Sequence, residues 1–392
     1  MDKEVRKIIG GVFKQIAEGL ETGSFAGKIR VGLTTLGSEL GDKELIRGAE
    51  MAASRNPSLE VVLIGSSEKS SLKTIPTSDE KEMHERMEAL LDSGEIDCCV
   101  TMHYNFPIGV STVGRVVTPG AGREMYIATT TGTSAVDRVE AMVKNAVYGI
   151  ACAKAMGNQR PTLGILNVDG ARQVERILLG LREKGYNIDF AQSQRSDGGH
   201  VMRGNDLLTG TPDIMVTDTL TGNILMKVFS SYTTGGSYES LGYGYGPGVG
   251  EGYKRIILIL SRASGAPVAA NAIEYAAALA RGRLPEVADR EMAAAKKAGL
   301  EELLAATRKE QPKAAAKEEV AAPPKKVVTA SISGIDIMDL DSAVEVLWRG
   351  GIYAETGMGC TGPVVMVAED DLEDAKGLLE KEGYVAKETE EC

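Results

Sequence analysis

The sequence is poor in cysteine and histidine and has no long apolar run, and each shortage excludes a class of protein. Five cysteines in 392 residues are too few for a disulfide framework, and with only three histidines they show no zinc-site spacing. No stretch approaches the roughly 20 apolar residues of a membrane span. A net charge of -11 argues against a nucleic-acid groove and against an anionic membrane surface. We therefore expect a cytoplasmic protein without a metal ion.

The apolar and charged fractions are ordinary for globular proteins, and a chain of 392 residues is expected to form more than one domain. Residues 1–25 carry apolar side chains at helical spacing, which predicts an N-terminal amphipathic helix. Residues 26–307 alternate short, continuously apolar strands with helices. This alternation predicts a three-layer α/β domain, a mostly parallel sheet with helices on both faces. Its strands are expected at 28–34, 59–64, 96–102, 125–130, 163–168, 187–191 and 213–217.

The composition changes after the α/β domain. Residues 308–326 are rich in alanine, lysine, glutamate and proline without an apolar period, which is typical of a linker. Residues 327–392 then follow a β-α-β-β-α pattern, with helices expected at 340–349 and 372–383. We expect a small α+β C-terminal domain that carries Cys360.

Ligands of parallel sheets usually bind beyond the carboxyl ends of the strands. The loops after Thr34, after Met102 and after Thr217 are therefore the expected places for a site. The second of these loops contains His103, which could shuttle a proton, and Asn105, which could donate a hydrogen bond. A structural role for the histidine is the alternative.

The string Asp218 to Lys227, DTLTGNILMK, opens a helix directly after a strand. A helix N-terminus with the hydroxyl of Thr219 and the close backbone approach of Gly222 suits a phosphate oxyanion. Asn223 and Lys227 are four residues apart and share a helix face, while Asp218 could act as a base. The alternative is an ordinary helix cap with a solvated lysine.

Cys360 lies in the string ETGMGCTGP, between Gly359 and, beyond Thr361, Gly362. A thiol among glycines can be accessible, and neighbouring backbone N–H groups can stabilise a thioester carbonyl. The string also fits GxGxxG, but no helix follows it, which argues against dinucleotide binding. The alternative is a glycine-rich hairpin turn with an uninvolved cysteine.

The other cysteines are predicted to be structural. Cys98 and Cys99 are adjacent in a strand and point to opposite faces, Cys152 lies in a helical pattern, and Cys392 is terminal. Residues 235–252 contain eight glycines in eighteen positions and are expected to form a lid over the site or a surface loop.

Several strings resemble, in the same order, the phosphate acyltransferases of bacterial phospholipid synthesis, which are related to phosphotransacetylases. They are RVGLTTLGSELGDKELIRGAEMA, GEIDCCVTMHYNFPIG, AKAMGNQRPTLGILNV, TGTPDIMVTDTLTGNILMK and GYGPGVGEGYKRIILILSRASGAPVAANAIEYAA. This chain lacks the long apolar insertion that those enzymes carry after the position of Lys227, which favours a small acyl group such as acetyl. It adds the segment with ETGMGCTGPVVMVAEDDLEDAKGLL.

Because it lacks the apolar insertion and carries the added C-terminal segment, the whole chain resembles the alpha subunits of component C of the glycine/sarcosine/betaine reductases of anaerobes, which take part in Stickland fermentation. The resemblance implies that an acetyl group is carried as a thioester on Cys360 and released as acetyl phosphate by phosphorolysis. It implies a beta subunit similar to condensing enzymes and encounters with selenoprotein A. It implies no cofactor, because inorganic phosphate is a substrate.

The resulting hypothesis is an enzyme subunit in which Cys360, on the C-terminal domain, delivers acetyl to phosphate held at the Asp218 helix. Two alternatives stay open. The chain could be a coenzyme-A-dependent acyltransferase of the phosphotransacetylase kind, or a non-catalytic scaffold for the beta subunit.

Overall fold

The computed structural model describes residues 27–65, 68–194, 198–309, 320–335, 339–359 and 362–385. The predicted helix at 1–25, residues 310–319 of the predicted linker, and Cys360 lie outside the described residues.

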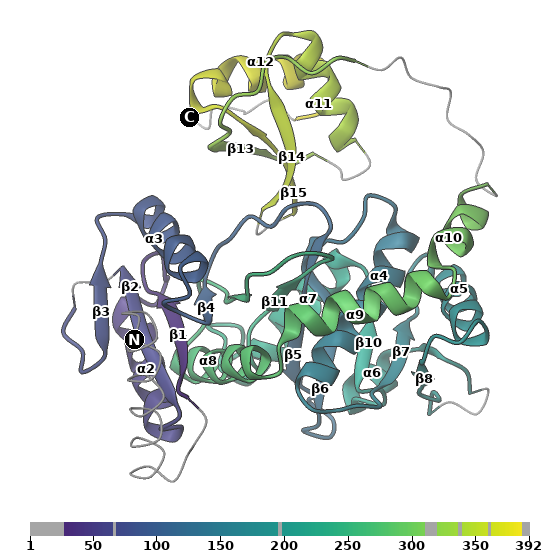
Figure 1. Cartoon of the computed structure of the whole chain (residues 1–392), viewed down its shortest axis with the longest axis horizontal. Coiled ribbons are helices and arrows are strands. Elements are labelled where there is room, and N and C mark those ends of the chain that lie inside the picture. The colour runs from purple at the N-terminus through teal and green to yellow at the C-terminus, as the bar shows by residue number, and fades with distance from the viewer. Residues whose placement is uncertain are drawn as a thin grey trace, which may run out of the picture.

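A twelve-stranded sheet forms the centre of the larger part of the molecule (Figure 1). In spatial order its path is β3 (Lys73–Pro76), β2 (Leu59–Gly65), β1 (Ile29–Thr34), β4 (Cys98–Thr101), β12 (Ile257–Ile259), β11 (Gly246–Val249), β5 (Val110–Val117), β6 (Glu124–Thr133), β10 (Ile214–Val216), β7 (Thr162–Leu166) and β8 (Asp189–Phe190). The twelfth strand, β9 (Val201–Met202), pairs with β7 off this path.

Strand direction divides this sheet into two halves. One half, with β3, β2, β1, β4 and β12, is parallel throughout, and so is the other half, with β6, β10, β7, β8 and β9. Between them, β11 is antiparallel to both β12 and β5, and β5 is antiparallel to β6. The mostly parallel sheet is therefore confirmed, but its two halves run in opposite directions.

Helices cover both faces of the sheet, which confirms the three-layer prediction. The cluster of buried apolar residues on one face includes residues of α2 (Asp42–Arg55), α4 (Arg138–Ala155), α5 (Ala171–Glu183), α8 (Ala266–Arg281), α9 (Leu284–Lys297) and α10 (Leu300–Lys309). The cluster on the other face includes residues of α3 (Glu80–Asp92), α6 (Gly204–Thr209) and α7 (Thr219–Ser231). Adjacent Cys98 and Cys99 belong to opposite clusters, as their positions in β4 predict.

The glycine-rich segment 235–252 is not a loop throughout. Residues 246–249 form β11, a buried strand between β12 and β5. At Gly246 the backbone φ is 92°, and a Cβ atom would lie 1.8 Å from the carbonyl oxygen of Val113. Glycine is therefore required for the close approach of two strands here, whereas the sequence suggested a flexible loop.

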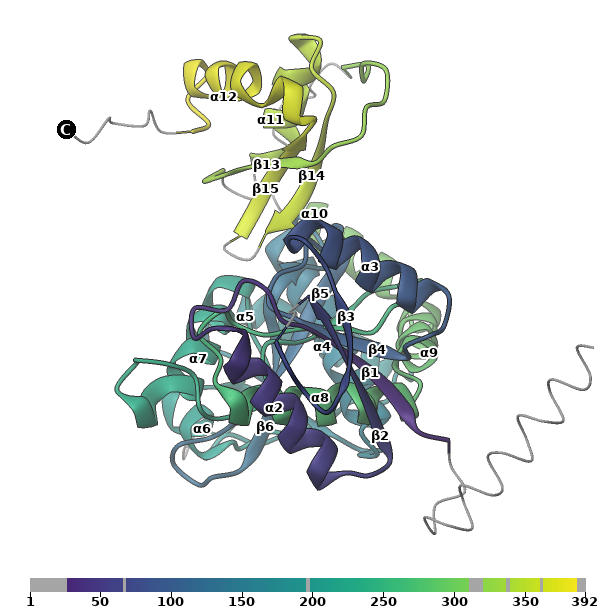
Figure 2. The same ribbon diagram turned by 90° about the vertical axis from the view of Figure 1, so that its left-hand side faces the viewer.

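The C-terminal part has its own three-stranded antiparallel sheet, in the order β13 (Ala330–Ser333), β15 (Gly362–Val367) and β14 (Ala354–Gly359). One side is covered by α11 (Leu340–Arg349) and α12 (Leu372–Lys381), and a separate cluster of buried apolar residues joins them. The predicted β-α-β-β-α order is confirmed. Figures 1 and 2 show the β14–β15 hairpin extending toward the main sheet.

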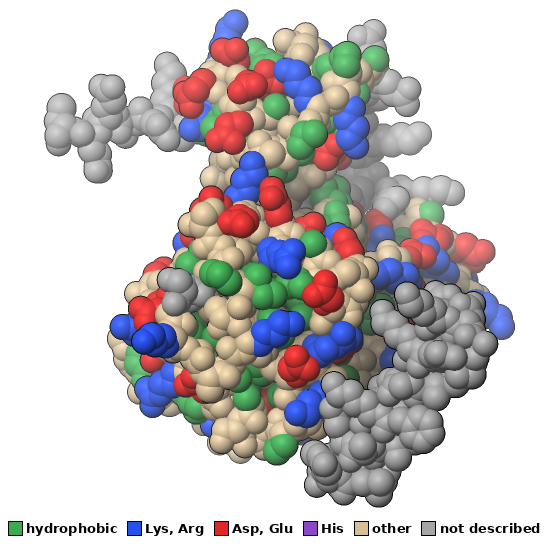
Figure 3. Space-filling model, turned by 60° about the vertical axis from the view of Figure 1, so that its left-hand side comes forward, with side chains coloured by type: hydrophobic (Ala, Val, Ile, Leu, Met, Phe, Trp, Pro, Cys, Tyr) green, Lys and Arg blue, Asp and Glu red, His purple; other side chains and the backbone are tan. Residues whose placement is uncertain are grey.

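The surface mixes both signs of charge. Figure 3 shows acidic and basic side chains interspersed with apolar ones over the face that it presents, rather than one continuous charged area. Within the described ranges, no helix combines the length and apolar character needed to cross a membrane.

Candidate functional site

The sheet has a topological switch point where β6 lies beside β10. These strands are parallel neighbours, but α4, which follows β6, covers one face, while α7, which follows β10, covers the other. Helices that diverge to opposite faces leave a crevice beyond the carboxyl ends of the two strands, where ligands of α/β sheets usually bind. The structure thus provides a site at the ends of β6 and β10.

The start of α7 is bound to the end of β6. The Thr219 hydroxyl donates to the Gly132 carbonyl oxygen at 2.9 Å, and Asn223 Nδ2 donates to the Thr130 carbonyl oxygen at 3.1 Å. A Cβ atom at Gly222 would lie 1.7 Å from the Thr129 carbonyl oxygen, so only glycine allows this contact. Four of the predicted site residues, at 218, 219, 222 and 223, are therefore brought together at the switch point.

Asp218 is the N-cap of α7. One carboxylate oxygen accepts from the Thr221 backbone N–H at 3.1 Å, and the other accepts from the Thr221 hydroxyl at 2.7 Å. These contacts are those of an ordinary helix cap, which was the alternative to a role of Asp218 as a base. The cap leaves the first N–H groups of the helix directed toward the crevice, where the helix dipole favours an anion.

Hydroxyl side chains at the switch point were missed in the sequence. Thr217, the residue between β10 and Asp218, is fully buried, and its Oγ1 has no hydrogen-bond partner among the described residues. Ser134 and Ser111 both donate to Asn145 Oδ1, at 2.7 and 2.9 Å. The signal in the sequence was the run TTTGTS at 129–134, which ends a strand with hydroxyl groups.

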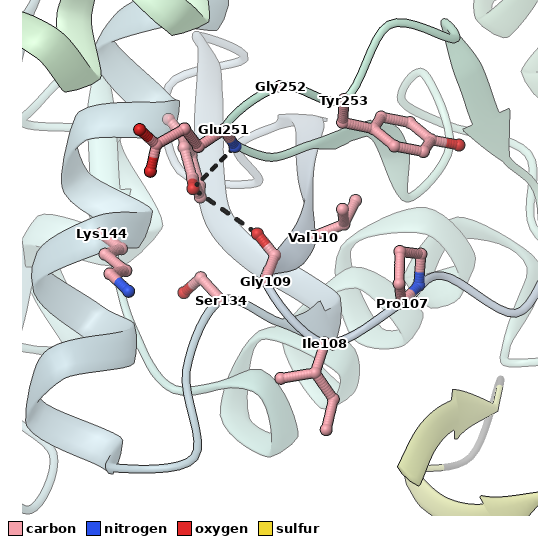
Figure 4. A pocket seen from close by; sticks show the side chains of 10 residues that line it. Pro107, Ile108, Gly109, Val110, Ser134, Lys144, Glu251, Gly252 and Tyr253 are labelled. Carbon is pink, nitrogen blue, oxygen red and sulfur yellow. Dashed lines mark hydrogen bonds between the residues drawn. The ribbon is translucent and has the colours of Figure 1, made fainter. Parts of the chain in front are cut away.

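A pocket of about 370 Å³ opens beside this end of β6 (Figure 4). Its lining comes from the segment before and into β5, from the residue after β6, from α4 and from the loop after β11: Pro107, Ile108, Gly109, Val110, Ser134, Lys144, Tyr148, Glu251, Gly252 and Tyr253. The Tyr148 hydroxyl group accepts from the Glu251 backbone N–H at 3.2 Å and donates to the Gly109 carbonyl oxygen at 3.5 Å. These bonds fix the loop after β11 against α4.

Lys144 is the cation of this pocket. Its Nζ lies 2.7 Å from Glu140 Oε1, and burial lowers its pKa from the usual value. Burial also raises the pKa of Tyr148 to about 12, so that its hydroxyl group stays protonated at neutral pH. The pocket therefore offers hydrogen-bonding groups and a shielded ammonium next to the switch point.

The β14–β15 hairpin contacts the main sheet at this pocket. An antiparallel β-bridge joins Met358 of β14 to Phe106, whose next neighbour, Pro107, lines the pocket. Both hairpin strands also contact β6. In Figure 4 the strands of the C-terminal domain lie on the side of Pro107 and Ile108.

The hairpin itself is regular up to its last described pair, Gly359 opposite Gly362. Cys360 and Thr361, which connect these glycines in the chain, lie outside the described residues. Gly357, Gly359 and Gly362 of the glycine-rich string therefore belong to strands β14 and β15.

His103 belongs to a second polar cluster, on the other half of the sheet. Its ring centroid lies 6.3 Å from that of His84 in α3, and Arg262 acts electrostatically on both rings. Burial is the largest influence on both histidines and lowers their pKa values, which favours the neutral form. Asn105 is exposed.

Lys227 also belongs to this side of the molecule. Its Nζ lies 2.8 Å from Glu239 Oε1 and donates to Ser261 Oγ at 2.7 Å, and Ser261 precedes Arg262 in the chain. Arg262 in turn pairs with Glu80 of α3 at 3.2 Å. Ser261 and Arg262 thus connect α7 to α3, and neither was recognised in the sequence.

The expectation that the loops after Thr34, Met102 and Thr217 share one edge is wrong. Because β11 and β5 reverse the strand direction, the carboxyl ends of β1 and β4 lie at the edge opposite to that of β10. His103 is consequently separated from the start of α7. Lys227 lies about two turns further along α7 and is bound to Glu239 and Ser261.

The three described cysteines are packed in the core. Cys98, Cys99 and Cys152 are free thiols with no exposed surface, and burial raises their pKa values. The structural role predicted for them is confirmed. None of them is suited to carry an acyl group.

Comparison with known proteins relates the chain to acyl-transferring enzymes. The model of the family "Fatty acid synthesis protein" matches residues 29–366. The chain is 63% identical over 383 residues to the glycine/sarcosine/betaine reductase complex component C subunit alpha of Peptoclostridium acidaminophilum, covering 98% of this chain and all of that protein. It is 25% identical over 240 residues to the phosphate acyltransferase of Lysinibacillus sphaericus, covering 51% of this chain and 70% of that enzyme.

Among solved structures, a branched-chain phosphotransacylase from Enterococcus faecalis matches 64% of this chain and 99% of its own, with a TM-score of 0.42 and 16% identity. The chain belongs to the fatty acid synthesis protein family and, within it, to the component C alpha subunits of the glycine/sarcosine/betaine reductases, with phosphate acyltransferases as distant relatives. The resemblance recognised in the sequence is confirmed.

Proposed function

We propose that this chain is the subunit of a glycine/sarcosine/betaine reductase complex that transfers an acetyl group from a thioester on Cys360 to inorganic phosphate. Acetyl phosphate is the product. The proposal takes the complex from the name of the 63% identical relative and the reaction class from the phosphate acyltransferases. No cofactor is required, because phosphate is itself a substrate.

The observation that carries the proposal is the β-bridge between Phe106 and Met358. Met358 precedes Cys360 by two residues, and Phe106 precedes the pocket residue Pro107. We therefore propose that a thioester on Cys360 is delivered from this hairpin to the switch point, where phosphate is proposed to bind.

In the proposed reaction a phosphate oxygen attacks the thioester carbonyl carbon. A carbon–oxygen bond forms, the carbon–sulfur bond breaks, and the Cys360 sulfur leaves as a thiolate that then takes up a proton. Because a thiolate is a good leaving group, the protein contributes mainly placement and stabilisation of negative charge.

Phosphate binding is assigned to the first turn of α7. The proposed donors are the backbone N–H groups of Thr219 and Leu220 and the buried Thr217 hydroxyl, which has no partner among the described residues. The Thr219 hydroxyl donates to Gly132 and so helps to hold this turn against β6. Asp218 acts by capping this turn, and Gly222 and Asn223 hold it against β6. Gly359 and Gly362, the last described pair of the hairpin, flank Cys360 in the chain and are proposed to accommodate its thioester.

Lys227 and His103 receive a different assignment. Lys227 is bound to Glu239 and Ser261, so we propose that it positions α7 rather than contacts phosphate. We assign no step to His103, which lies in the His84 cluster.

The proposed partners follow from membership of the complex. They are a condensing-enzyme-like beta subunit and selenoprotein A, which supply the acetyl group, and the proposed location is the cytoplasm. The scaffold alternative is favoured by one observation, the capping contacts of Asp218, which need no chemistry.

The test uses acetyl phosphate labelled in its acetyl group, incubated with the full chain, followed by mass spectrometry of the peptides. Label is expected on Cys360 and is expected to disappear in Cys360→Ser, while the matched control Cys392→Ser keeps it. Acetyl release to phosphate is expected to fall at least about 100-fold in Cys360→Ser.

Three other outcomes contradict the proposal. Label on Cys98, Cys99 or Cys152 removes Cys360 from the reaction. Acetyl phosphate formation that depends on coenzyme A and survives Cys360→Ser supports the phosphotransacetylase alternative. Phosphorolysis by the beta subunit alone, at the rate of the whole complex, supports the scaffold.

A further inference from the structure

The pocket beside β6 has an apolar side and a polar side. Pro107 and Ile108 lie on the side of the C-terminal hairpin, whereas Lys144 and Ser134 lie on the side of α4 (Figure 4). In this view the Lys144 ammonium and the Ser134 hydroxyl group turn toward one another. The proposed reaction brings together a neutral acetyl thioester and an anion, and a pocket divided in this way has a place for each.

Lys144 is the only cation in the described lining of the pocket, and its ammonium has donors left for a ligand. Its Nζ lies 2.7 Å from Glu140 Oε1, which is its one ion-pair partner among the described residues. An ammonium has three N–H groups, so two remain for another acceptor. The anion of the lining, Glu251, is neutralised by Lys296, whose Nζ donates to its two carboxylate oxygens at 2.7 and 2.6 Å. The pocket can therefore accept a negative charge at Lys144.

The end of β6 connects Lys144 to the start of α7. The Gly132 carbonyl oxygen accepts from the Thr219 hydroxyl at 2.9 Å. Two residues further on, Ser134 donates at 2.7 Å to Oδ1 of Asn145, the neighbour of Lys144 in α4. Residues 132–134 thus bind α7 on one side of the crevice and α4 on the other, so the first turn of α7 and Lys144 flank the same strand end.

The first turn of α7 does not neutralise phosphate by itself. Inorganic phosphate is an anion at neutral pH, and removing an anion from water is costly unless a charged partner compensates for it. The residue that caps α7, Asp218, carries a carboxylate, and the lysine of the helix, Lys227, is bound to Glu239 and Ser261. A phosphate site at this turn therefore needs a cation from another element.

We infer that Lys144 contacts the phosphate bound at the switch point and supplies the positive charge that the first turn of α7 lacks. The inference rests on the proposed phosphorolysis for its ligand, inorganic phosphate, but not on the identity of the thiol. Lys144 acts by binding: no bond to it forms or breaks, and the phosphate oxygen and the sulfur react as proposed above. Burial lowers the pKa of Lys144, and a bound phosphate offsets this effect because it favours the ammonium form.

The first test measures the binding of inorganic phosphate to the full chain by calorimetry. Wild type and Cys360→Ser are expected to bind it equally, because the thiol is not part of the phosphate site. Lys144→Gln is expected to bind it about 10- to 100-fold more weakly, because a charge-assisted contact is lost. The matched control is Lys154→Gln, which removes a shielded lysine from the same helix, paired with Glu291 at 2.7 Å and outside the pocket lining. It is expected to bind phosphate like wild type.

The second test needs no variant and decides the matter if Lys144→Gln does not fold. Wild type is treated with an amine-reactive ester in sodium phosphate or in sodium chloride of equal ionic strength, and mass spectrometry measures the labelling of each lysine. Phosphate is expected to lower the labelling of Lys144 several-fold and to leave that of Lys154 unchanged. In steady-state assays of the complex, Lys144→Gln is expected to raise the KM for phosphate more than it lowers kcat.

The outcomes separate this inference from the proposed function. Equal phosphate binding by Lys144→Gln and wild type, labelling of Lys144 that phosphate does not change, or a wild type that binds no phosphate overturns the inference, even if Cys360 carries the acetyl label. Loss of phosphate binding in Lys144→Gln supports it, even if the acetyl label is found on another cysteine.

Discussion

Gly222 is the residue on which the contact between α7 and β6 depends. A methyl group there would lie 1.7 Å from the Thr129 carbonyl oxygen, which belongs to a central strand and cannot move aside. Gly222→Ala is therefore expected to lower the free energy of unfolding by about 3 kcal/mol, or to displace α7 from the sheet. Gly204→Ala, at the start of α6 with open space around it, is the control and is expected to change stability by less than about 1 kcal/mol.

Urea denaturation of both variants measures this difference. Equal midpoints for Gly222→Ala and Gly204→Ala would mean that α7 does not need its close approach to β6. A displaced α7 also moves the proposed phosphate site, so the Gly222 variant is expected to lose acetyl release in parallel with stability.

His84 and His103 make the stability of the chain dependent on pH. Burial, the largest influence on both, lowers their pKa values below the usual 6.5, although Glu80 acts in the opposite direction on both. Below pH 6.5 the unfolded chain consequently binds more protons than the folded chain, and acidification favours unfolding. The stabilisation is complete above about pH 6.5 and decreases as the pH falls below it.

The measurement is the free energy of unfolding at pH 7.5, 6.5 and 5.5. Wild type is expected to lose more stability between pH 6.5 and 5.5 than His84→Gln or His103→Gln, which remove one buried titrating ring each. Identical slopes for the variants and the wild type would show that the rings titrate normally.

At the scale of elements, the sequence predicted most strands and helices of the α/β domain because each has a local signature. The strand expected at 59–64 is β2, and the helix expected at 340–349 matches α11 from end to end. Continuous apolar runs and helical periodicity are properties of neighbouring residues, and the sequence contains them.

Strand direction and partners are not local, and here prediction failed. Nothing in residues 110–117 or 246–249 indicates that β5 and β11 run against their neighbours and reverse the sheet. Glycines in β11 suggest a loop, although Gly246 serves the close approach to Val113. The same reversal explains which predicted site residues lie together. Residues 218–223 form one contiguous cluster, as predicted, whereas His103 was assigned to the wrong edge of the sheet.

The molecule as a whole consists of two separately packed parts that meet at one described hairpin. The buried apolar residues of the C-terminal domain form a cluster of their own, distinct from the two clusters of the main sheet. β14 is an edge strand of its sheet, so its outer backbone groups are available to another strand. The Phe106–Met358 bridge uses this edge. The linker predicted at 308–326 would raise the local concentration of the hairpin at the pocket without a large interface.

The bridge predicts a specific effect of the Met358 backbone. Within the hairpin Met358 is opposite Pro363, which has no N–H group to exchange with it, so we infer that this is a non-hydrogen-bonded pair of the antiparallel ladder. In such a pair the N–H and C=O groups of Met358 point away from β15, toward the side where Phe106 lies. Met358→Pro removes this donor, whereas Met358→Ala shortens the side chain and keeps it. We expect Met358→Pro to slow single-turnover acetyl release from Cys360 by about 10- to 100-fold relative to Met358→Ala, because a displaced thioester reacts poorly.

Hydrogen exchange provides a readout that is independent of activity: the backbone around Phe106 is expected to exchange faster in the proline variant only. If the two variants exchange and react alike, the bridge does not position the hairpin, and delivery to the pocket must depend on contacts with β6 instead.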